Sequence, residues 1–536
     1  MRKSLRFVVT IILSVWCLQY RIKVSAETFK QVTLYTSQIN ISYLARKASE
    51  LVQATALTVK KSITDSNLST SQLQLLGRYC PRITFLDLSN SGAGDAHMVL
   101  LAKQFPVLTT LDVSSLALTD TGFKTLSSSL FAPRLSGLTL SYTKLTSKGF
   151  ALGLKRFTGL KTLGVFADGG NFKDAGFAAL AASPCASRLT GLMLYSTGIT
   201  DQEFIRSISK FASLTSLNLK MNNLGNKALA ALASTRFAPQ LSALNLDNNA
   251  LTDAGLTATV LRKFTGLKSL NIAGSAQVTL MGPGLKALAL APFAGQLTSL
   301  GLSATGIKSQ DFAYIRYFRS LTSLDISKIL LTDVGLKALS QAPCAEHLTS
   351  LKLGFGVSSS GFSSAIKAFK NLMSLDISLN TIGDRGFKAL VDAPCAEKLI
   401  TLVTYKTGIT RTSLAYLKKF TRLKNINIGG NSLGDAGLAI LANSALAPKL
   451  ITLYAPQISL TASGFAKSSP VLNKLSQLGN LDLSYNTIEY AGFEVIAKTV
   501  FAPKLQSLTL RNIGSKQPLA TSSLLKNFKQ LQKASF

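Results

Sequence analysis

The sequence is poor in histidine, cysteine, tryptophan and acidic residues. Its 536 residues include two histidines, five cysteines and one tryptophan, and 25 aspartates and glutamates stand against 58 lysines and arginines. His97 and His347 are too few to complete the ligand set of a zinc centre. The sequence also shows no phosphate-binding loop, no clustered histidines and no nucleophile paired with a base. We therefore predict no enzyme activity, no metal site and no cofactor, while the net charge of +33 favours acidic partners.

The few cysteines follow a repeated pattern rather than a chemical one. Cys185, Cys344 and Cys395 each follow a proline in the near-copies "SPCASRLTGLML", "APCAEHLTSLKL" and "APCAEKLITLVT". Other copies carry "FAP" or "LAP" in this region, so we interpret the cysteines as packing side chains. Cys344 and Cys395 lie two repeats apart, too far for a disulfide bond. His347 becomes arginine or lysine in the other copies, which argues against a metal motif.

The chain opens with a short apolar segment. Residues 1–26 read "MRKSLRFVVTIILSVWCLQYRIKVSA", in which basic residues precede an apolar run from Phe7 to Leu18 and a small-residue site at Val24-Ser25-Ala26. This pattern is typical of a secretory signal peptide, with an uncleaved anchor as the alternative. No later stretch is long and apolar enough to span a bilayer. We therefore expect export, to a secreted, periplasmic or cell-surface location.

One pattern, Leu-x-x-Leu-x-Leu followed by a turn and an amphipathic run, recurs every 24 to 30 residues or about 27 on average. Its clear copies begin at Leu108, Leu135, Leu160, Leu189, Leu214, Leu241, Leu267, Leu297, Leu321, Leu348, Leu372, Leu399, Leu423, Leu450, Leu478 and Leu505. Weaker copies near Phe29, near Ala54 and at Ile83 bring the total to about nineteen repeats.

Two types of repeat alternate along the chain. One carries Leu-Asp/Asn-Ile/Leu, then Asp-x-Gly-Phe/Leu, and ends in Ala-Pro or Pro-Cys-Ala. The other carries Thr-Gly-Ile-Thr or a relative and ends in Lys/Arg-Phe, as in "LKRFTGL" and "LKKFTRL". These repeats resemble the leucine-rich repeat, and their length and alternation are similar to the ribonuclease-inhibitor-like class and to bacterial repeats of the GALA type. The resemblance covers nearly all of the chain after the apolar segment.

A single repeat can be interpreted physically. Leu324 and Ile326 point inward from a short strand, while Asp325 between them points to the open face. Asp333 is placed to cap a helix whose Leu336 faces the strand. Stacked strands lie about 4.8 Å apart and packed helices about 8–10 Å apart, so the stack bends with its sheet inside. The predicted fold is an α/β solenoid, a horseshoe of about nineteen repeats with a parallel inner sheet and outer helices.

We expect four segments along the chain. They are a signal peptide at 1–26, degenerate N-terminal repeats or a cap at 27–82, the leucine-rich-repeat solenoid at 83–510 and a polar C-terminal cap at 511–536. Glycine-rich insertions at Gly164–Phe177 and Asn271–Leu285 are expected to form loops on one edge, either by neutral drift or for binding.

The predicted inner face carries aromatic and acidic candidates for partner binding. Exposed aromatics among small polar residues are typical of protein-binding surfaces, although scattered surface aromatics are also ordinary. The candidates are Tyr142, Phe166, Tyr195, Asp325, Phe355, Asp376, Tyr405, Tyr454 and Tyr485. The carboxylates of alternate strands would lie about 9.6 Å apart, which suits a hydrogen-bonded ladder better than an acid–base pair and makes a hydrolase a remote alternative.

Basic residues recur near the end of every second repeat. Those expected to form a basic edge are Lys155, Arg156, Arg262, Lys263, Arg316, Arg319, Lys418, Lys419 and Arg422. Cations at helix C-termini stabilise the helix dipole, and this alone accounts for one charge per repeat. The larger excess predicts a positive ridge for an acidic protein, anionic lipid or glycan. Nucleic acid is disfavoured, since no reading motif accompanies the charge.

These observations favour a non-enzymatic, exported scaffold, a monomer that binds a protein through its concave face and adjacent edge. The resemblance implies protein binding as the usual activity. One alternative is a cell-envelope protein held to anionic lipid or polysaccharide by the basic edge. A remote alternative is a host-directed effector linked to ubiquitin machinery, because repeats of the GALA type are joined to an F-box. No F-box-like segment is evident in the sequence, which argues against that role.

Overall fold

The computed structural model describes residues 31–61, 65–166, 171–274 and 280–536. The predicted signal peptide at 1–26 lies outside the described residues, as does the middle of both glycine-rich insertions. The chain divides into two compact units, which are described one at a time. Unit 1 holds mainly the described residues up to 274, and unit 2 mainly those from 280 onward.

The described residues of unit 1 contain ten short strands that run parallel. They are β1 (Gln31–Tyr35), β2 (Ala56–Lys60), β3 (Phe85–Asp87), β4 (Thr110–Asp112), β5 (Gly137–Thr139), β6 (Thr162–Phe166), β7 (Gly191–Tyr195), β8 (Ser216–Asn218), β9 (Ala243–Asn245) and β10 (Ser269–Asn271). Strands consecutive in sequence pair in register, so that Leu86 lies beside Leu111 and Leu111 beside Leu138.

The helices of unit 1 follow the strands in alternation. The α-helices are α2 (Ile41–Arg46), α3 (Ala48–Leu51), α4 (Thr70–Tyr79), α5 (Asp95–Gln104), α6 (Asp120–Ser127), α7 (Ser147–Leu154), α8 (Lys173–Ala181), α9 (Asp201–Ser207), α10 (Asn226–Ala233) and α11 (Ala258–Leu261). Short 3₁₀ helices are η1 (Thr36–Gln38), η2 (Ala132–Arg134), η3 (Ala186–Arg188), η4 (Ile208–Lys210), η5 (Ala238–Gln240) and η6 (Asp253–Gly255).

Unit 2 repeats the same plan with ten more parallel strands. They are β11 (Ser299–Gly301), β12 (Ser323–Asp325), β13 (Ser350–Lys352), β14 (Ser374–Asp376), β15 (Thr401–Val403), β16 (Asn425–Asn427), β17 (Thr452–Tyr454), β18 (Asn480–Asp482), β19 (Ser507–Thr509) and β20 (Lys533–Ser535). Strand β20 pairs with β19, so residues 511–536 add one strand to the about nineteen expected from the repeats.

The helices of unit 2 are likewise interleaved with its strands. The α-helices are α12 (Gly282–Ala289), α13 (Thr332–Ser340), α14 (Ser359–Ala365), α15 (Gly383–Val391), α16 (Arg411–Leu414), α17 (Gly434–Asn443), α18 (Ala462–Lys467), α19 (Ser469–Leu472) and α20 (Glu489–Ala497). The 3₁₀ helices are η7 (Ala294–Gln296), η8 (Ser309–Tyr317), η9 (Ile366–Ala368), η10 (Ala396–Lys398), η11 (Leu417–Lys419), η12 (Ala447–Lys449), η13 (Ala502–Lys504), η14 (Leu519–Thr521) and η15 (Ser523–Asn527).

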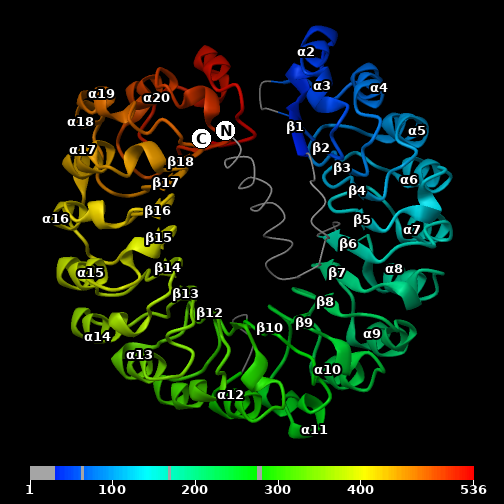
Figure 1. Ribbon diagram of the computed structural model, residues 1–536, viewed down its shortest axis with the longest axis horizontal. Coiled ribbons are helices and arrows are strands. Elements are labelled where there is room, and N and C mark those ends of the chain that lie inside the picture. The colour runs from blue at the N-terminus through cyan, green and yellow to red at the C-terminus, as the bar shows by residue number, and fades with distance from the viewer. Residues whose placement is uncertain (1–30, 62–64, 167–170, 275–279) are drawn as a thin grey trace. The chain divides into compact units, whose positions relative to one another are not determined.

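In each unit the strands line the inner side and the helices cover the outer side (Figure 1). This arrangement confirms the predicted α/β solenoid with a parallel inner sheet. The bend follows from the wider spacing that helices need. Among the described residues no helix is both long and apolar enough to cross a bilayer.

The alternation of repeat types has a packing basis. Phe123, from a Gly-Phe repeat, stacks on Phe157, from the Arg-Phe ending of the next repeat, with ring centroids 5.5 Å apart. Phe177 and Phe211 repeat the arrangement at 5.7 Å. All four rings are fully buried between strands and helices. Each type of repeat therefore supplies one half of an aromatic pair in the core.

The described cysteines are buried and free, as the repeated pattern predicted. Burial raises the pKa of Cys80 to about 12 and that of both Cys344 and Cys395 to about 11. Thiols in this environment stay protonated at neutral pH and behave as small apolar side chains. This confirms the absence of a disulfide bond between Cys344 and Cys395.

The predicted role of Asp333 as a helix cap within its own repeat is wrong. Helix α13 begins at Thr332, and no side chain caps it. The carboxylate of Asp333 instead accepts hydrogen bonds from the backbone N and Oγ of Ser358, at 2.8 and 2.6 Å. Ser358 is the N-cap of α14 in the next repeat. Asp333 lies past the cap position, so its side chain reaches the neighbouring repeat rather than the start of its own helix.

This contact between repeats, which we call the aspartate latch, recurs in both units. The pairs with two hydrogen bonds of this kind are Asp95 with Thr119, Asp120 with Thr146, Asp174 with Thr200, Asp333 with Ser358, Asp384 with Thr410 and Asp435 with Thr461. Several of the threonine or serine N-caps are followed, three residues later, by a glycine, which leaves room for the aspartate side chain. A Cβ on Gly149, for example, would lie 2.1 Å from Oδ1 of Asp120.

Candidate functional site

Many of the strands end in an aspartate or asparagine whose side chain holds the turn that follows. Oδ1 of Asp325 accepts the backbone N–H of Ser327 at 3.1 Å, and Oδ1 of Asp376 accepts that of Ser378 at 2.9 Å. Asparagine or aspartate makes the same bond after β3, β4, β8, β9, β10, β16 and β18. Asp325 and Asp376 thus lie on the predicted face, with one carboxylate oxygen engaged in the turn.

The aspartates at the strand ends lie in two kinds of environment, which shift their pKa values in opposite directions. Burial, followed by repulsion from Asp87 on the adjacent strand, raises the pKa of Asp112 to about 6. At Asp325 burial alone would raise the pKa, but hydrogen bonds from Lys352 and Ser327 outweigh it and hold the pKa below its ordinary value. Nζ of Lys352 lies 2.8 Å from Oδ2 of Asp325. Negative charge is therefore stabilised at Asp325 and opposed at Asp112.

The third residue after most of the strands has a left-handed backbone, and this feature was not evident from the sequence. In most repeats it is small or polar, as at Asn90, Ser115 and Asn248. Bulky side chains occupy it at Tyr142, Met221, Leu379 and Tyr485, with φ between 53° and 62°. Left-handed φ is a marked outlier for bulky residues. Tyr142, Leu379 and Tyr485 are nevertheless 56%, 53% and 59% exposed, so their side chains project into solvent.

In unit 1 the predicted aromatics come together. Phe166 and Tyr195 are register partners at the ends of β6 and β7, with ring centroids 6.4 Å apart. The backbone N–H of Tyr142 donates to the carbonyl of Phe166, so Tyr142 is their neighbour on the next turn. Phe166 and Tyr195 are half-buried and Tyr142 is exposed. We call these three residues the aromatic cluster.

In unit 2 the predicted aromatics are spread over separate strands. Phe355 follows β13, Tyr405 follows β15, Tyr454 ends β17 and Tyr485 follows β18. Tyr405 is half-buried beside its own neighbour, with Nζ of Lys406 5.4 Å from the ring centroid. Exposed Leu330 pairs with Phe355 across an isolated bridge and was missed by the sequence analysis. An exposed leucine in a leucine-rich repeat gives no sequence signal of its own.

The turns are backed by buried asparagines that the sequence analysis also missed. Oδ1 of Asn222 accepts backbone N–H groups of Thr197 and Gly198 in the preceding repeat, at 3.0 and 3.1 Å. Its Nδ2 donates to the carbonyl of Leu219 in its own repeat at 3.0 Å. Asn249, Asn380, Asn431 and Asn486 make equivalent contacts. Fully satisfied buried amides of this kind rigidify the rim that carries the exposed side chains.

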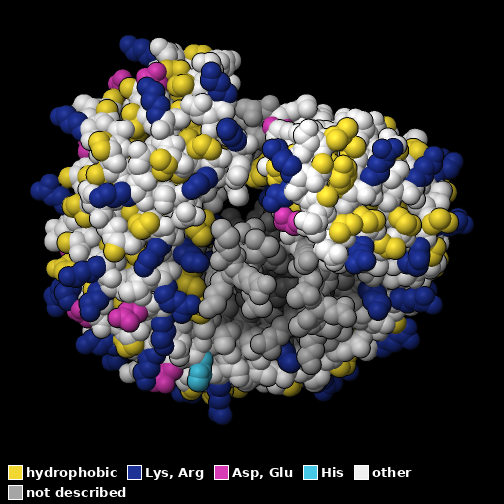
Figure 2. Space-filling view, turned by 45° about the horizontal axis from the view of Figure 1, so that its top comes forward, with side chains coloured by type: hydrophobic (Ala, Val, Ile, Leu, Met, Phe, Trp, Pro, Cys, Tyr) yellow, Lys and Arg dark blue, Asp and Glu magenta, His cyan; other side chains and the backbone are white. Residues whose placement is uncertain are grey.

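All residues of the predicted basic edge are exposed and lie where helices end and strands begin. Lys155 is the C-cap of α7 and Arg262 that of α11. Arg316 belongs to η8, and its guanidinium lies 5.1 Å from the ring of Tyr317. Figure 2 shows that Lys and Arg side chains far outnumber Asp and Glu on the face it presents. Arg156, Lys263, Lys418 and Lys419 lie just before the phenylalanine that ends their repeat, whereas Arg319 and Arg422 lie just after it.

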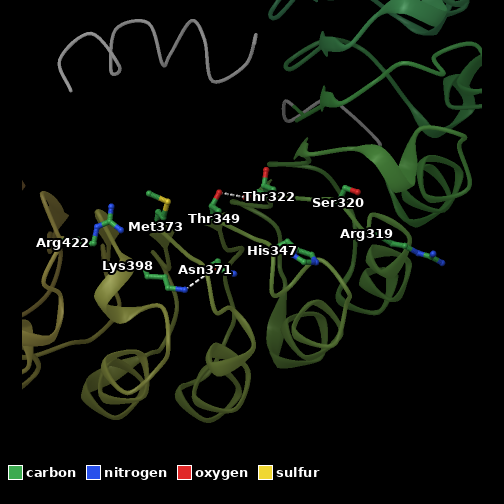
Figure 3. Close-up of a pocket in the computed structure, with 9 residues that line it drawn as sticks. All are labelled: Arg319, Ser320, Thr322, His347, Thr349, Asn371, Met373, Lys398 and Arg422. Atoms are coloured by element: carbon green, nitrogen blue, oxygen red, sulfur yellow. Dashed lines mark hydrogen bonds between the residues drawn. The ribbon is translucent and has the colours of Figure 1, made fainter. Parts of the chain in front are cut away.

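In unit 2 part of this edge is hollowed into a shallow groove of about 570 Å³ (Figure 3). Its lining is Arg319, Ser320, Thr322, His347, Thr349, Asn371, Met373, Lys398 and Arg422, the residues that lead into β12 to β16. Nζ of Lys398 donates to Oδ1 of Asn371 at 2.7 Å. No carboxylate lines this groove, and the nearby Glu346 is paired with Lys370 at 2.6 Å. We call this feature the basic groove.

The described residues contain no group of three or more His, Cys, Asp or Glu side chains placed to hold a metal ion. The features that the structure offers for recognition are therefore surfaces: the aromatic cluster, the bulky side chains at left-handed turns and the basic groove.

Comparisons with known proteins agree with the architecture. The family model described as "Leucine Rich repeat" matches residues 212–233 and 370–391. Ribonuclease inhibitor of Sus scrofa is 28% identical over 313 residues, 54% of this chain and 68% of its own length. Ribonuclease inhibitor of Mus musculus is 26% identical over 329 residues, 57% of this chain and 72% of its own length. A solved internalin of Listeria monocytogenes is 21% identical, covers 65% of this chain and 81% of its own, and has a TM-score of 0.34.

The repeated Leu-x-x-Leu-x-Leu strand, the parallel sheet with outer helices and the sequence matches lead to one conclusion. The chain is a leucine-rich-repeat protein whose repeats are similar to those of ribonuclease inhibitor.

Proposed function

We propose that this protein is a non-enzymatic scaffold that binds a protein partner through its inner strand face and the rim beyond it. A leucine-rich-repeat solenoid is suited to protein binding, and the finer assignment to this face is our proposal. The observation that carries it is the exposure of Tyr142, Leu379 and Tyr485 at left-handed turns. Strained backbone persists where the surroundings over-determine it, and such positions cluster at functional sites.

Rigidity supports the same assignment. Buried asparagines hold the turns that carry Tyr195, Leu379 and Tyr485, so these side chains are placed before a partner arrives. Placing them in advance lowers the entropy lost on association. Tyrosines are also frequent among the residues that dominate binding energy at protein interfaces. The two relatives named ribonuclease inhibitors act, by their names, on another protein, which supports a protein partner for this chain.

We also propose that the protein acts after export and as a monomer. The support for export is the pattern of residues 1–26, in which basic residues, an apolar run and a small-residue site follow one another. Fractionation of cells that express the tagged full chain, with N-terminal sequencing of the product, tests this proposal. Recovery of uncleaved protein from the cytosol would overturn it.

The inner-face assignment is tested by variants of the aromatic cluster. The partner is first identified by crosslinking the tagged full chain and by mass spectrometry, and its affinity is then measured with purified proteins. Tyr142→Ala with Tyr195→Ala should weaken that affinity by about tenfold or more, because both rings lose contact area at the centre of the surface.

Leu152→Ala is the matched control. Leu152 is 56% exposed, like Tyr142, but lies on the outer helix α7. It should change the affinity by less than about twofold. Equal effects of the inner and outer variants, or none from either, would contradict the assignment to the inner face.

A second candidate is association with an anionic lipid or glycan surface. The observation that favours it is the exposed basic edge together with a net charge of +33. Its test is binding to anionic vesicles or glycan across a salt series.

A further inference from the structure

The basic groove includes two arginines that have no acidic partner among the described residues. Arg319 and Arg422 lie near its two ends, and within the described part of the chain neither guanidinium has a hydrogen-bond or ion-pair partner. Other basic residues of this edge do have partners, as Lys398 has in Asn371 and Lys449 in the carbonyl of Thr421. A free guanidinium group can bind a carboxylate in bidentate fashion, so each of these arginines offers a contact for an anion.

The groove also presents hydrogen-bond acceptors between these cations. Oγ1 of Thr322 donates its hydrogen to the carbonyl of Thr298, and Oγ1 of Thr349 donates to the carbonyl of Thr322, both at 3.1 Å. A hydroxyl group has one hydrogen and two lone pairs, so these oxygens can only accept further bonds. The groove therefore combines guanidinium donors at its ends, and the ammonium group of Lys398, with acceptor oxygens between them.

This combination favours one kind of anion. Phosphate and sulfate groups carry acceptor oxygens, which match the guanidinium groups but not the threonine oxygens. An acidic polypeptide offers both partners, carboxylates for Arg319 and Arg422 and backbone N–H groups for Thr322 and Thr349. The exposed side chain of Met373 lies between them and adds an adaptable apolar contact.

The length of the groove fits a short extended segment. Its lining residues lead into five consecutive strands, β12 to β16. Neighbouring strands lie about 4.8 Å apart, so the first and last are separated by about 19 Å. An extended peptide rises about 3.3 Å per residue and covers that distance with about six residues. A single small anion would engage only one end.

We propose that the basic groove binds an acidic segment of a protein partner, about six residues long and rich in aspartate or glutamate. This inference rests on the proposed function only in taking the partner to be a protein. It concerns a different surface, because the groove leads into the strands whereas the exposed side chains at left-handed turns follow them.

The test measures the fluorescence anisotropy of a labelled peptide with six consecutive glutamates on titration with the full-length protein, at an ionic strength of about 0.1 M. A peptide of the same length with glutamine in place of glutamate shows what binding remains without charge. Arg319→Gln with Arg422→Gln should weaken binding of the glutamate peptide by about tenfold or more. Thr349→Val, which keeps the shape but removes the acceptor oxygen, should weaken it by about threefold without altering its salt dependence.

The matched control is Arg262→Gln with Lys263→Gln, which removes the same charge from the equivalent edge in unit 1. It should change the dissociation constant by less than about twofold. Equal weakening by both double variants would show diffuse attraction to a basic protein and would overturn the groove. If the arginine double variant fails to fold, the single change Lys398→Gln serves in its place and should weaken binding by about threefold.

Other polyanions decide the chemical class. Polyuridylate, a sulfated glycan of similar charge and vesicles with anionic lipid are offered as competitors. If any of them displaces the labelled peptide at a lower concentration of negative charge than unlabelled glutamate peptide does, the assignment to an acidic polypeptide is overturned. Failure of the peptide to bind, with partner affinity still dependent on Tyr142 and Tyr195, would refute the groove and leave the proposed function standing.

Discussion

The carboxylates of Asp87 and Asp112 lie side by side as register partners on β3 and β4. The pKa of Asp112 is raised to about 6, first by burial and then by Asp87. Other repeats place asparagine at this position, as at Asn218, and use its Oδ1 for the same turn bond. The charge of Asp112 is thus unnecessary for the turn and unfavourable for the fold.

Asp112→Asn should therefore stabilise the protein at neutral pH. A carboxyl group whose pKa is higher folded than unfolded loses stability as the pH rises from about 4 to about 6. The variant should raise the free energy of unfolding by about 1 to 2 kcal/mol at pH 7 and by almost nothing at pH 4. Urea unfolding at both pH values measures this difference.

Asp325→Asn is the control of opposite sign. The hydrogen bond from Lys352 holds the pKa of Asp325 below its ordinary value, so its charge stabilises the fold above the unfolded pKa. That variant should lower the free energy of unfolding at neutral pH by about 0.5 to 1 kcal/mol, and less as the pH falls. Equal changes in the two variants would contradict the environments described for these carboxylates.

Sequence patterns predicted single residues unevenly. The cysteines were predicted correctly because three copies of one segment could be aligned, and their neighbours varied freely. The exposed role of Leu379 was missed because leucine in such a chain is read as core. Only the backbone shows that it occupies a left-handed turn, where other repeats carry asparagine or serine. A search for bulky residues three positions after the strand aspartate would find this site in related sequences.

At the scale of the element, the aspartate latch joins one helix to the start of the next. Asp120 lies in the first turn of α6, and its carboxylate accepts two bonds from Thr146, the N-cap of α7. Gly149 provides the space, since a Cβ there would lie 2.1 Å from Oδ1 of Asp120. Hydrophobic periodicity in the sequence predicted the strands and helices. It could not predict the contact between Asp120 and Thr146, because capping rules consider one helix at a time.

A double-mutant cycle tests the latch. Asp120→Ala alone should lower the free energy of unfolding by about 1 to 2 kcal/mol, the usual effect of losing a helix cap. Gly149→Ala alone should be at least as harmful, because its methyl group collides with the carboxylate. The two changes together should be less harmful than their sum by about 1 kcal/mol. Additive effects in chemical denaturation would show that the residues do not meet.

At the scale of the whole molecule, the excess of base over acid is the dominant electrostatic property. The formal net charge of +33 creates a field that attracts any polyanion at low salt, whatever its chemistry. Screening within about 10 Å at 0.1 M salt removes most of this attraction. Specific recognition, by contrast, depends on particular residues and persists at higher salt.

Binding to anionic vesicles should therefore be strong at about 0.02 M salt and should fall by more than about tenfold at about 0.3 M. Cosedimentation with vesicles of neutral and of partly anionic lipid measures the effect, and the neutral vesicles serve as the control. Absence of binding even at the lowest salt would retire the envelope alternative. Binding that persists undiminished at the higher salt would point to an apolar contact instead of charge.

The latch also gives the chain a direction of assembly. Each aspartate belongs to the earlier repeat, and each threonine or serine that it holds belongs to the later one. The N-cap residue of a helix therefore donates its hydrogen bonds to an aspartate of the preceding repeat. During synthesis the N-terminal side emerges first, so at each latch the aspartate is made before the residue that it holds. Loss of an early repeat would remove the acceptor at the helix N-terminus of the next repeat. Loss of a late repeat would leave the helix of the preceding repeat capped.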